Sequence, residues 1–221
     1  MIEQHFWIFL HLLLFVYWLG GDLGVFILAK AAKRSDLSFA ERAFALRMAI
    51  MIDLVPRLCF AVMFPVGLHV TASGGYALIP DWAFVLAWLI AALWIGLLFA
   101  MGKYEGTSRG AQLGQVNLGL QAVLLVVLGT LGMTALLGLG PLPGGWFGAK
   151  ILLFALIFAA SIGIDFAFRP IGPAFAALAT QGSQPDIERE ISVAVDGAIR
   201  YVILLYLLIA AIAFLGVTKF F

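Results

Sequence analysis

The chain has 221 residues, of which 64% are hydrophobic and only 11% are charged. A soluble domain has about half apolar and about a quarter charged residues, so this composition excludes a soluble globular protein and indicates an integral membrane protein. With 13 Lys and Arg against 12 Asp and Glu, the chain has no basic excess to neutralise phosphates, which argues against a nucleic-acid partner.

Six apolar stretches follow one another along the chain, and each is long enough to cross a hydrocarbon core of about 30 Å. Helices are expected, because the strands of a membrane barrel would alternate in polarity and these stretches do not. We therefore predict an all-α, six-transmembrane helix bundle that forms a single domain over residues 1–221. The predicted spans are 5–31, 46–72, 82–102, 112–138, 146–169 and 193–217.

The connections between the spans differ in charge. Residues 73–81 and 138–145 are Gly/Pro turns that are almost uncharged, whereas the first and third connections are basic. Because Lys and Arg are biased toward the cytoplasm, the basic connections are expected inside and both termini outside, in a bacterial-type inner (cytoplasmic) membrane. The basic residues are Lys30, Lys33, Arg34, Arg42 and Arg47 in the first connection, and Lys103 and Arg109 in the third.

A short repeat places charged residues at matching positions in the first two and the last two spans. Its matches are "LGGDLGVF" around Asp22 with "SIGIDFAF" around Asp165, and Asp53-x-x-x-Arg57 with Asp196-x-x-x-Arg200. Spans three and four would then be an inserted central hairpin. Charges within a span are costly, so these groups are either ion pairs between helices or a proton path, and matched charges favour ion pairs. Span-four amides are expected to hydrogen-bond across helices: Gln112, Gln115, Asn117 and Gln121.

All three histidines lie in the predicted outer halves of their spans. On an ideal helix His11, Trp18 and Asp22 fall within about 40° of one another, whereas His5 points roughly a third of a turn away. His11 is therefore expected to face the interior, where imidazole can be the axial ligand of a porphyrin, with Trp18 as a candidate cofactor contact. His69 is a candidate second metal ligand, and the alternative is an interfacial residue at the helix end.

Lys150 lies one turn beyond Trp146 at the outer end of span five. Its ammonium could anchor the helix at the interface beside that tryptophan. Alternatively it could neutralise a carboxylate such as a porphyrin propionate. The six methionines are scattered and do not form the cluster of soft ligands typical of copper transport.

Two motifs resemble a known family. "LHLLLFVYWLGG", with His11 seven residues before Trp18, resembles the first helix of the HemJ type of membrane protoporphyrinogen IX oxidase. "GWFGAKILLF", with Trp146 four residues before Lys150, resembles that family's third helix. The same motifs are similar to those of CopD-like copper-resistance membrane proteins. The resemblance implies a HemJ-like four-helix unit with an inserted central hairpin, a haem-binding histidine at His11 and a functionally important lysine at Lys150. The fifth span of this chain departs from the family: it has "GIDFAF" where the family has a polar end.

Together these observations predict a membrane protein that binds heme b. If it is catalytic, the expected reaction is electron transfer between a reduced substrate such as a porphyrinogen and a quinone. Two other classes stay open: a copper or small-solute transporter that uses the Asp/Arg pairs as a polar path, and a non-catalytic subunit of a larger membrane complex. The lipid bilayer is the expected environment in each case, and a homo-oligomer is compatible with all of them.

Overall fold

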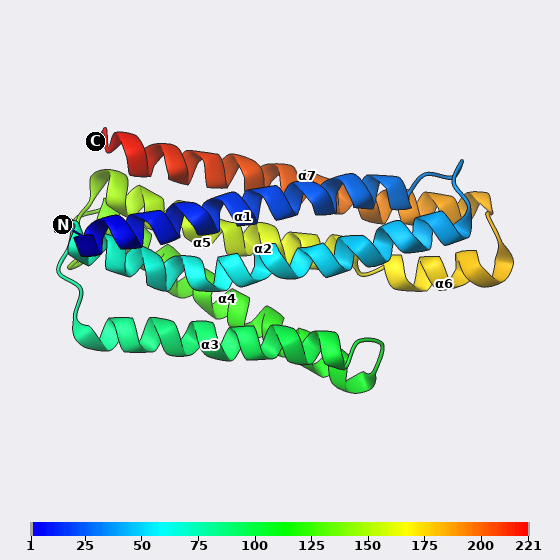
Figure 1. The fold of residues 1–221 in the computed structure, drawn as a ribbon, viewed down its shortest axis with the longest axis horizontal. Helices are drawn as coiled ribbons and strands as arrows, with labels where there is room; N and C mark the ends of the chain where they lie inside the picture. Colours follow the sequence, from blue (N-terminus) through cyan, green and yellow to red (C-terminus); the bar gives the residue numbers. More distant parts are fainter. Residues whose placement is uncertain (1, 221) are drawn as a thin grey trace. The chain divides into compact units, whose positions relative to one another are not determined.

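The computed structural model describes residues 2–220, which form seven helices and no strand (Figure 1). Six helical segments are long and apolar enough to cross a membrane, which confirms the predicted six-helix membrane bundle. Apart from the groups at its two ends, a helix satisfies its own backbone groups, as a membrane-spanning segment must. The helices are α1 (Ile2–Ala32), α2 (Phe39–Ser73), α3 (Asp81–Lys103), α4 (Ser108–Leu136), α5 (Gly145–Phe168), α6 (Ile171–Gln181) and α7 (Pro185–Thr218).

Two helices begin well before the spans predicted from hydrophobicity. α2 begins at Phe39 and α7 at Pro185, each about two turns early. Ser38 and Glu41 form a capping box at the start of α2, in which the carboxylate accepts hydrogen bonds from the Ser38 N–H and hydroxyl. Pro185 suits the first helical position because it has no N–H to leave unsatisfied. With 35 residues, α2 is roughly 50 Å long, so it extends beyond a hydrocarbon core of about 30 Å.

The predicted fifth span matches α5, but a further helix follows it that the hydrophobic pattern did not reveal. α5 ends at Phe168, just before Pro170, which cannot donate a backbone hydrogen bond and disfavours continuation of a helix. The Pro170 carbonyl accepts from the Ala174 N–H, so α6 begins at once. One side of α6 is buried with the spacing of an amphipathic helix, and its members are Ile171, Ala174, Phe175 and Leu178.

The helices form two compact units. One part of each of α1, α2 and α4 belongs to unit 1, and the other part belongs to unit 2. Unit 1 comprises the described residues up to Asp22 together with Asp53–Leu120. Unit 2 comprises Leu23–Ile52 together with the described residues from Gln121 onward. The predicted central hairpin is not a unit of its own, because α3 and the first part of α4 belong to unit 1. The single domain predicted for the whole chain stays a prediction.

In unit 1, an aromatic row joins α1, α2 and α3. Trp18 of α1 lies with its ring centroid 4.8 Å from that of Phe60 in α2, and Phe60 meets Trp94 of α3 edge-on at 5.2 Å. One turn along α1, a Cβ on Gly21 would lie only 2.9 Å from Cδ of Pro56. Glycine therefore permits α1 and α2 to approach closely at this point, as small residues do at membrane helix contacts.

In unit 2, α5 and α6 both pack against α7. An apolar cluster joins the end of α1, the start of α2, α6 and the start of α7. Burial of such a cluster contributes roughly 25 cal/mol per Å² of apolar surface removed from water. Its buried members are Ala29, Ala32, Ala45, Ile171, Ala174, Phe175, Leu178, Ile187, Ile191, Ala194 and Val195.

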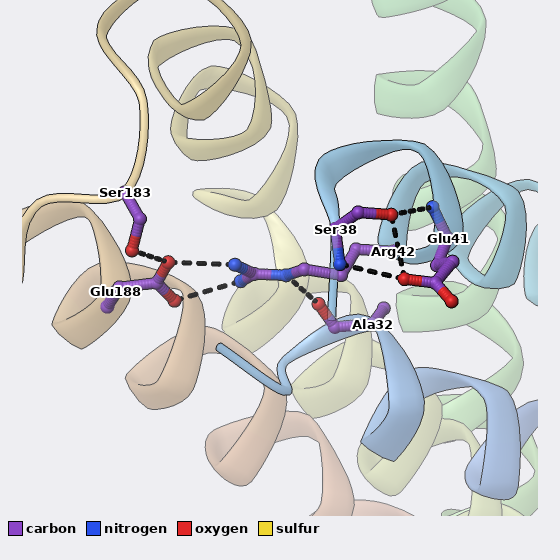
Figure 2. Close-up of polar contacts among 6 residues, drawn as sticks. All are labelled: Ala32, Ser38, Glu41, Arg42, Ser183 and Glu188. Carbon is purple, nitrogen blue, oxygen red and sulfur yellow. Dashed lines mark hydrogen bonds and ion pairs between the residues drawn. The ribbon is translucent and has the colours of Figure 1, made fainter. Parts of the chain in front are cut away.

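A buried arginine links the same elements of unit 2 (Figure 2). Arg42 of α2 is 1% exposed, and its two terminal nitrogens donate to the carboxylate of Glu188 in α7 at 2.7 and 2.9 Å. Its Nε donates to the carbonyl of Ala32 at the end of α1 at 2.9 Å. The Ser183 hydroxyl also donates to Glu188, at 2.7 Å. This bidentate geometry is the strongest form of an arginine–carboxylate pair.

Candidate functional site

His11 lies in the α1–α2 contact of unit 1. Its side chain is half-buried, whereas His5 on the same helix is exposed. A Cβ added to Gly67 of α2 would lie 3.4 Å from His11 Cε1 and 3.9 Å from its Nδ1. The Nδ1 atom is itself buried. The imidazole therefore lies over the α2 backbone at a position where the partner helix has no side chain, with its Nδ1 edge toward that helix.

His69 lies in an aromatic enclosure formed by α1, α2 and α3. The Trp7 ring stacks on the imidazole at a centroid distance of 3.9 Å with only 8° between the planes. Phe84 stacks on it at 4.6 Å. The indole Nε1 of Trp88 donates to His69 Nε2 at 3.1 Å. The ring thus has aromatic neighbours at 3.9 and 4.6 Å, and the nitrogen that most often binds iron accepts a hydrogen bond instead.

Trp18 is 3% exposed and packs on Phe60, so it is a core residue of unit 1. Asp22, one turn further along α1, is 9% exposed. The predicted shared face of α1 is thus buried at both of these positions and half-buried at His11. The structure brings Trp18 into the packed aromatic row, and its role as a cofactor contact stays a prediction.

Lys150 belongs to unit 2, where α5 packs along α7. A Cβ on Gly216 of α7 would lie 2.7 Å from Lys150 Nζ, so the amine lies directly over the α7 backbone. Lys219 lies nearby with its own Nζ 5.8 Å from the centre of the Trp146 ring. The half-buried Lys150 amine is thus held within a helix contact. The role of Lys150 beside a carboxylate stays a prediction.

The aspartates of the two Asp-x-x-x-Arg motifs form ion pairs with different partners, despite the identical spacing. Asp53 and Arg57 form an ion pair within α2. Asp196 of α7 instead pairs with Lys33, from the connection after α1, and also accepts from the Ser192 hydroxyl at 3.1 Å. Arg200 acts on Asp196 only through its charge. The sequence repeat therefore does not extend to the pairing of these charges.

The amides of α4 also divide into two groups. Asn117 and Gln121 are 2% and 1% exposed, whereas Gln112 and Gln115 are exposed. Asn117 accepts a hydrogen bond from the Trp94 indole at 2.9 Å within unit 1. Gln121 Nε2 donates to Asp165 at 3.4 Å within unit 2. The expected hydrogen bonds across helices thus form at these two positions, where the amides are buried and need partners.

Sequence reasoning missed the residues that shape the surroundings of the two histidines. Gly67 was missed because a glycine in an apolar span carries no chemical signal of its own. Trp7 and Trp88 are typical of aromatic belts at the membrane interface, and only their packing on His69 sets them apart. Within residues 2–220, no group of three or more His, Cys, Asp or Glu side chains could hold a metal ion. The chain matches no protein-family model, no curated protein and no solved structure.

Proposed function

We propose that this multi-pass membrane protein binds heme b through His11. The observation that carries the proposal is the position of the His11 imidazole over Gly67, inside the α1–α2 contact of unit 1. A histidine held between apolar helices is the usual way in which helix bundles hold such cofactors. The proposal includes a bacterial-type cytoplasmic membrane as the location, with both termini outside and the basic connections inside.

The residues present fit one axial histidine and not two. At His11, the bare backbone of Gly67 leaves room for the ring, and the edge that carries Nδ1 faces α2. Nε2 is then the nitrogen assigned to the iron. His69 does not fit a second ligand position, because Trp7 and Phe84 stack on its ring and its Nε2 accepts from Trp88. We therefore assign the ligand role to His11 alone.

The protein would contribute position and redox environment to this chemistry. Bound haem supplies one-electron transfer, and the resemblance implies a reduced substrate such as a porphyrinogen and a quinone as the acceptor. Within this chain, contact with Gly67 would hold the His11 ring in one orientation. The packed row of Trp18, Phe60 and Trp94 would exclude water from the same unit.

An absorption spectrum of the full chain, purified in mild detergent after expression with a haem precursor, tests this assignment. A Soret band is expected in the wild-type protein. His11→Ala should reduce the haem per protein to about a tenth or less, since each 1.4 kcal/mol of lost binding is a factor of ten. The controls are His5→Ala, which removes an exposed histidine of the same helix, and His69→Ala. Both should keep the band.

The possible outcomes separate the candidate functions. Protein without a Soret band, or a band that survives unchanged in His11→Ala, contradicts haem ligation by His11. A band that is lost in His69→Ala but kept in His11→Ala assigns the iron to the other histidine and also overturns the proposal. Circular dichroism and gel filtration of each variant show that a lost band does not arise from loss of the fold.

A further inference from the structure

Asp22 is buried in unit 1 close to the contact between α1 and α2. The residue is 9% exposed. The close contact between Gly21 and Pro56, one residue away, brings the two helix backbones together at this level. Within residues 2–220, the Asp22 carboxyl accepts no hydrogen bond and forms no ion pair. A polar side chain that is nine-tenths buried without a partner is rare, because its desolvation costs several kcal/mol when it is charged.

The charged groups that act on Asp22 are Asp53 and Arg57 of α2, and no others do so in the described part of the chain. Asp53 and Arg57 already form an ion pair with each other. If all three were ionised, two carboxylates would share one guanidinium. The cluster of Asp22, Asp53 and Arg57 would then carry a net negative charge inside an apolar span. Ionisable groups in a membrane are expected to neutralise one another or to mark an ion or proton path.

A proton is the cation that this cluster can accommodate. A metal ion such as Ca²⁺ needs six or more oxygen ligands, whereas the cluster offers one carboxylate at Asp22 and another that is engaged by Arg57. Protonation requires no further ligand: the Asp22 carboxylate takes one H⁺ from water and becomes a neutral carboxylic acid. The ionised Asp53–Arg57 pair is then left as a balanced partner beside it.

We propose that Asp22 is an intramembrane proton-binding site, at which the carboxyl group holds one exchangeable proton at neutral pH beside the Asp53–Arg57 ion pair. The inference does not depend on haem binding by His11. Asp53 and Arg57 form a structural ion pair, and Asp22 is the group able to take up and release a proton. A carboxyl group of this kind is a functional element of pumps and transporters.

Carbon-13 NMR of the full chain in lipid vesicles, with aspartate labelled at Cγ, tests the proposal directly. The Asp22 signal is assigned by its loss in Asp22→Asn, which preserves the shape of the side chain. In the wild-type protein at neutral pH this signal should lie at the position of a protonated acid. The matched control is Asp36→Asn, which removes an exposed carboxylate of the first connection and should leave the Asp22 signal unchanged.

A second variant tests the charge balance. Asp53→Asn removes the neighbouring carboxylate and leaves the Arg57 charge to act on Asp22, so the Asp22 signal should move to the position of an ionised carboxylate. An Asp22 signal at the ionised position in the wild-type protein overturns the proposal, as does a protonated signal that is unmoved in Asp53→Asn. Infrared spectra of the wild-type chain need no substitution, and they must show a protonated-acid C=O band that shifts in heavy water. Absence of that band also refutes the proposal, even if a variant does not fold.

Discussion

Arg42 illustrates how a charged side chain can be buried when each of its nitrogens finds a partner. It is 1% exposed, yet each of its three nitrogens donates a hydrogen bond, two to Glu188 and one to Ala32. The Phe175 ring also lies 5.8 Å from its guanidinium carbon. Arginine suits this position better than lysine, because its planar fork matches a carboxylate with two parallel hydrogen bonds.

Replacement of Arg42 by methionine should therefore destabilise the protein strongly. The variant keeps much of the side-chain volume but leaves the Glu188 carboxylate and the Ala32 carbonyl without these donors. We expect a loss of about 3 kcal/mol, the low end of the range for breaking a buried pair, because the Glu188 side chain is 18% exposed. The measurement is the free energy of unfolding in detergent, followed by circular dichroism.

The matched control for this prediction is Arg34→Ala. Arg34 pairs with Asp36 in an exposed position, and its hydrogen bonds hold the pKa of the Asp36 carboxyl below its usual value. Exposed pairs contribute only about 0–1 kcal/mol, so the control should unfold almost like the wild type. Equal unfolding free energies for the Arg42 and Arg34 variants would show that the buried contact does not stabilise the fold.

At the scale of helices, the close contacts occur where one partner lacks a side chain. A Cβ on Gly132 of α4 would lie 2.5 Å from the backbone nitrogen of Leu152 in α5. In the α5–α7 contact, a Cβ on Gly163 would lie 2.5 Å from the Tyr201 ring. Such positions let helix backbones approach and gain dispersion contacts, which replace the hydrophobic driving force that is absent between helices in lipid.

A pair of glycine substitutions in α4 tests this role. Gly132→Ala should destabilise the protein by about 1–3 kcal/mol, because the new Cβ meets backbone atoms that cannot move independently. Gly129→Ala, one turn earlier, places its Cβ at an ordinary 3.8 Å from that of Ala155. It should be neutral or stabilise by up to about 1 kcal/mol through the higher helix propensity of alanine. The measurement is the thermal unfolding of both variants in the same detergent. A Gly132→Ala variant that is more stable than Gly129→Ala would refute the assigned contact.

At the scale of the whole molecule, orientation in the membrane depends on the distribution of charge between connections. The connection after α1 contains Lys33 and Arg34, whereas residues 137–144, before α5, contain no charged residue. Positively charged connections are retained in the cytoplasm. With six spans, an even number, we expect both ends of the chain on the same, outer side.

Labelling of single cysteines by a membrane-impermeant maleimide tests this orientation. Cys59 is the only cysteine of the chain, and a Cys59→Ser background removes it. In this background Leu139→Cys, at a position that is 76% exposed, should react in intact spheroplasts of a bacterial host. Glu105→Cys, at an exposed position between α3 and α4, should react only after the membrane is permeabilised. The opposite pattern would mean that the chain is inserted the other way round.

The sequence by itself determined the six spans, because crossing a bilayer depends on the length and composition of each local segment, which can be read without knowing its neighbours. It also predicted that His11 and Asp22 share one inward face of a single helix, because this follows from the helical turn alone. In the structure Asp22 is buried and His11 is half-buried.

Only the tertiary structure decided which groups meet. Arg42 bonds to Glu188, 146 positions away, and Asp196 bonds to Lys33 rather than to the arginine four residues along its own helix. Neither choice has a local signal, because an ion pair depends on distances between segments that are remote in the sequence. Gly67 could not be identified from the sequence for the same reason. Its lack of a side chain matters only because the His11 ring lies against the backbone at this position.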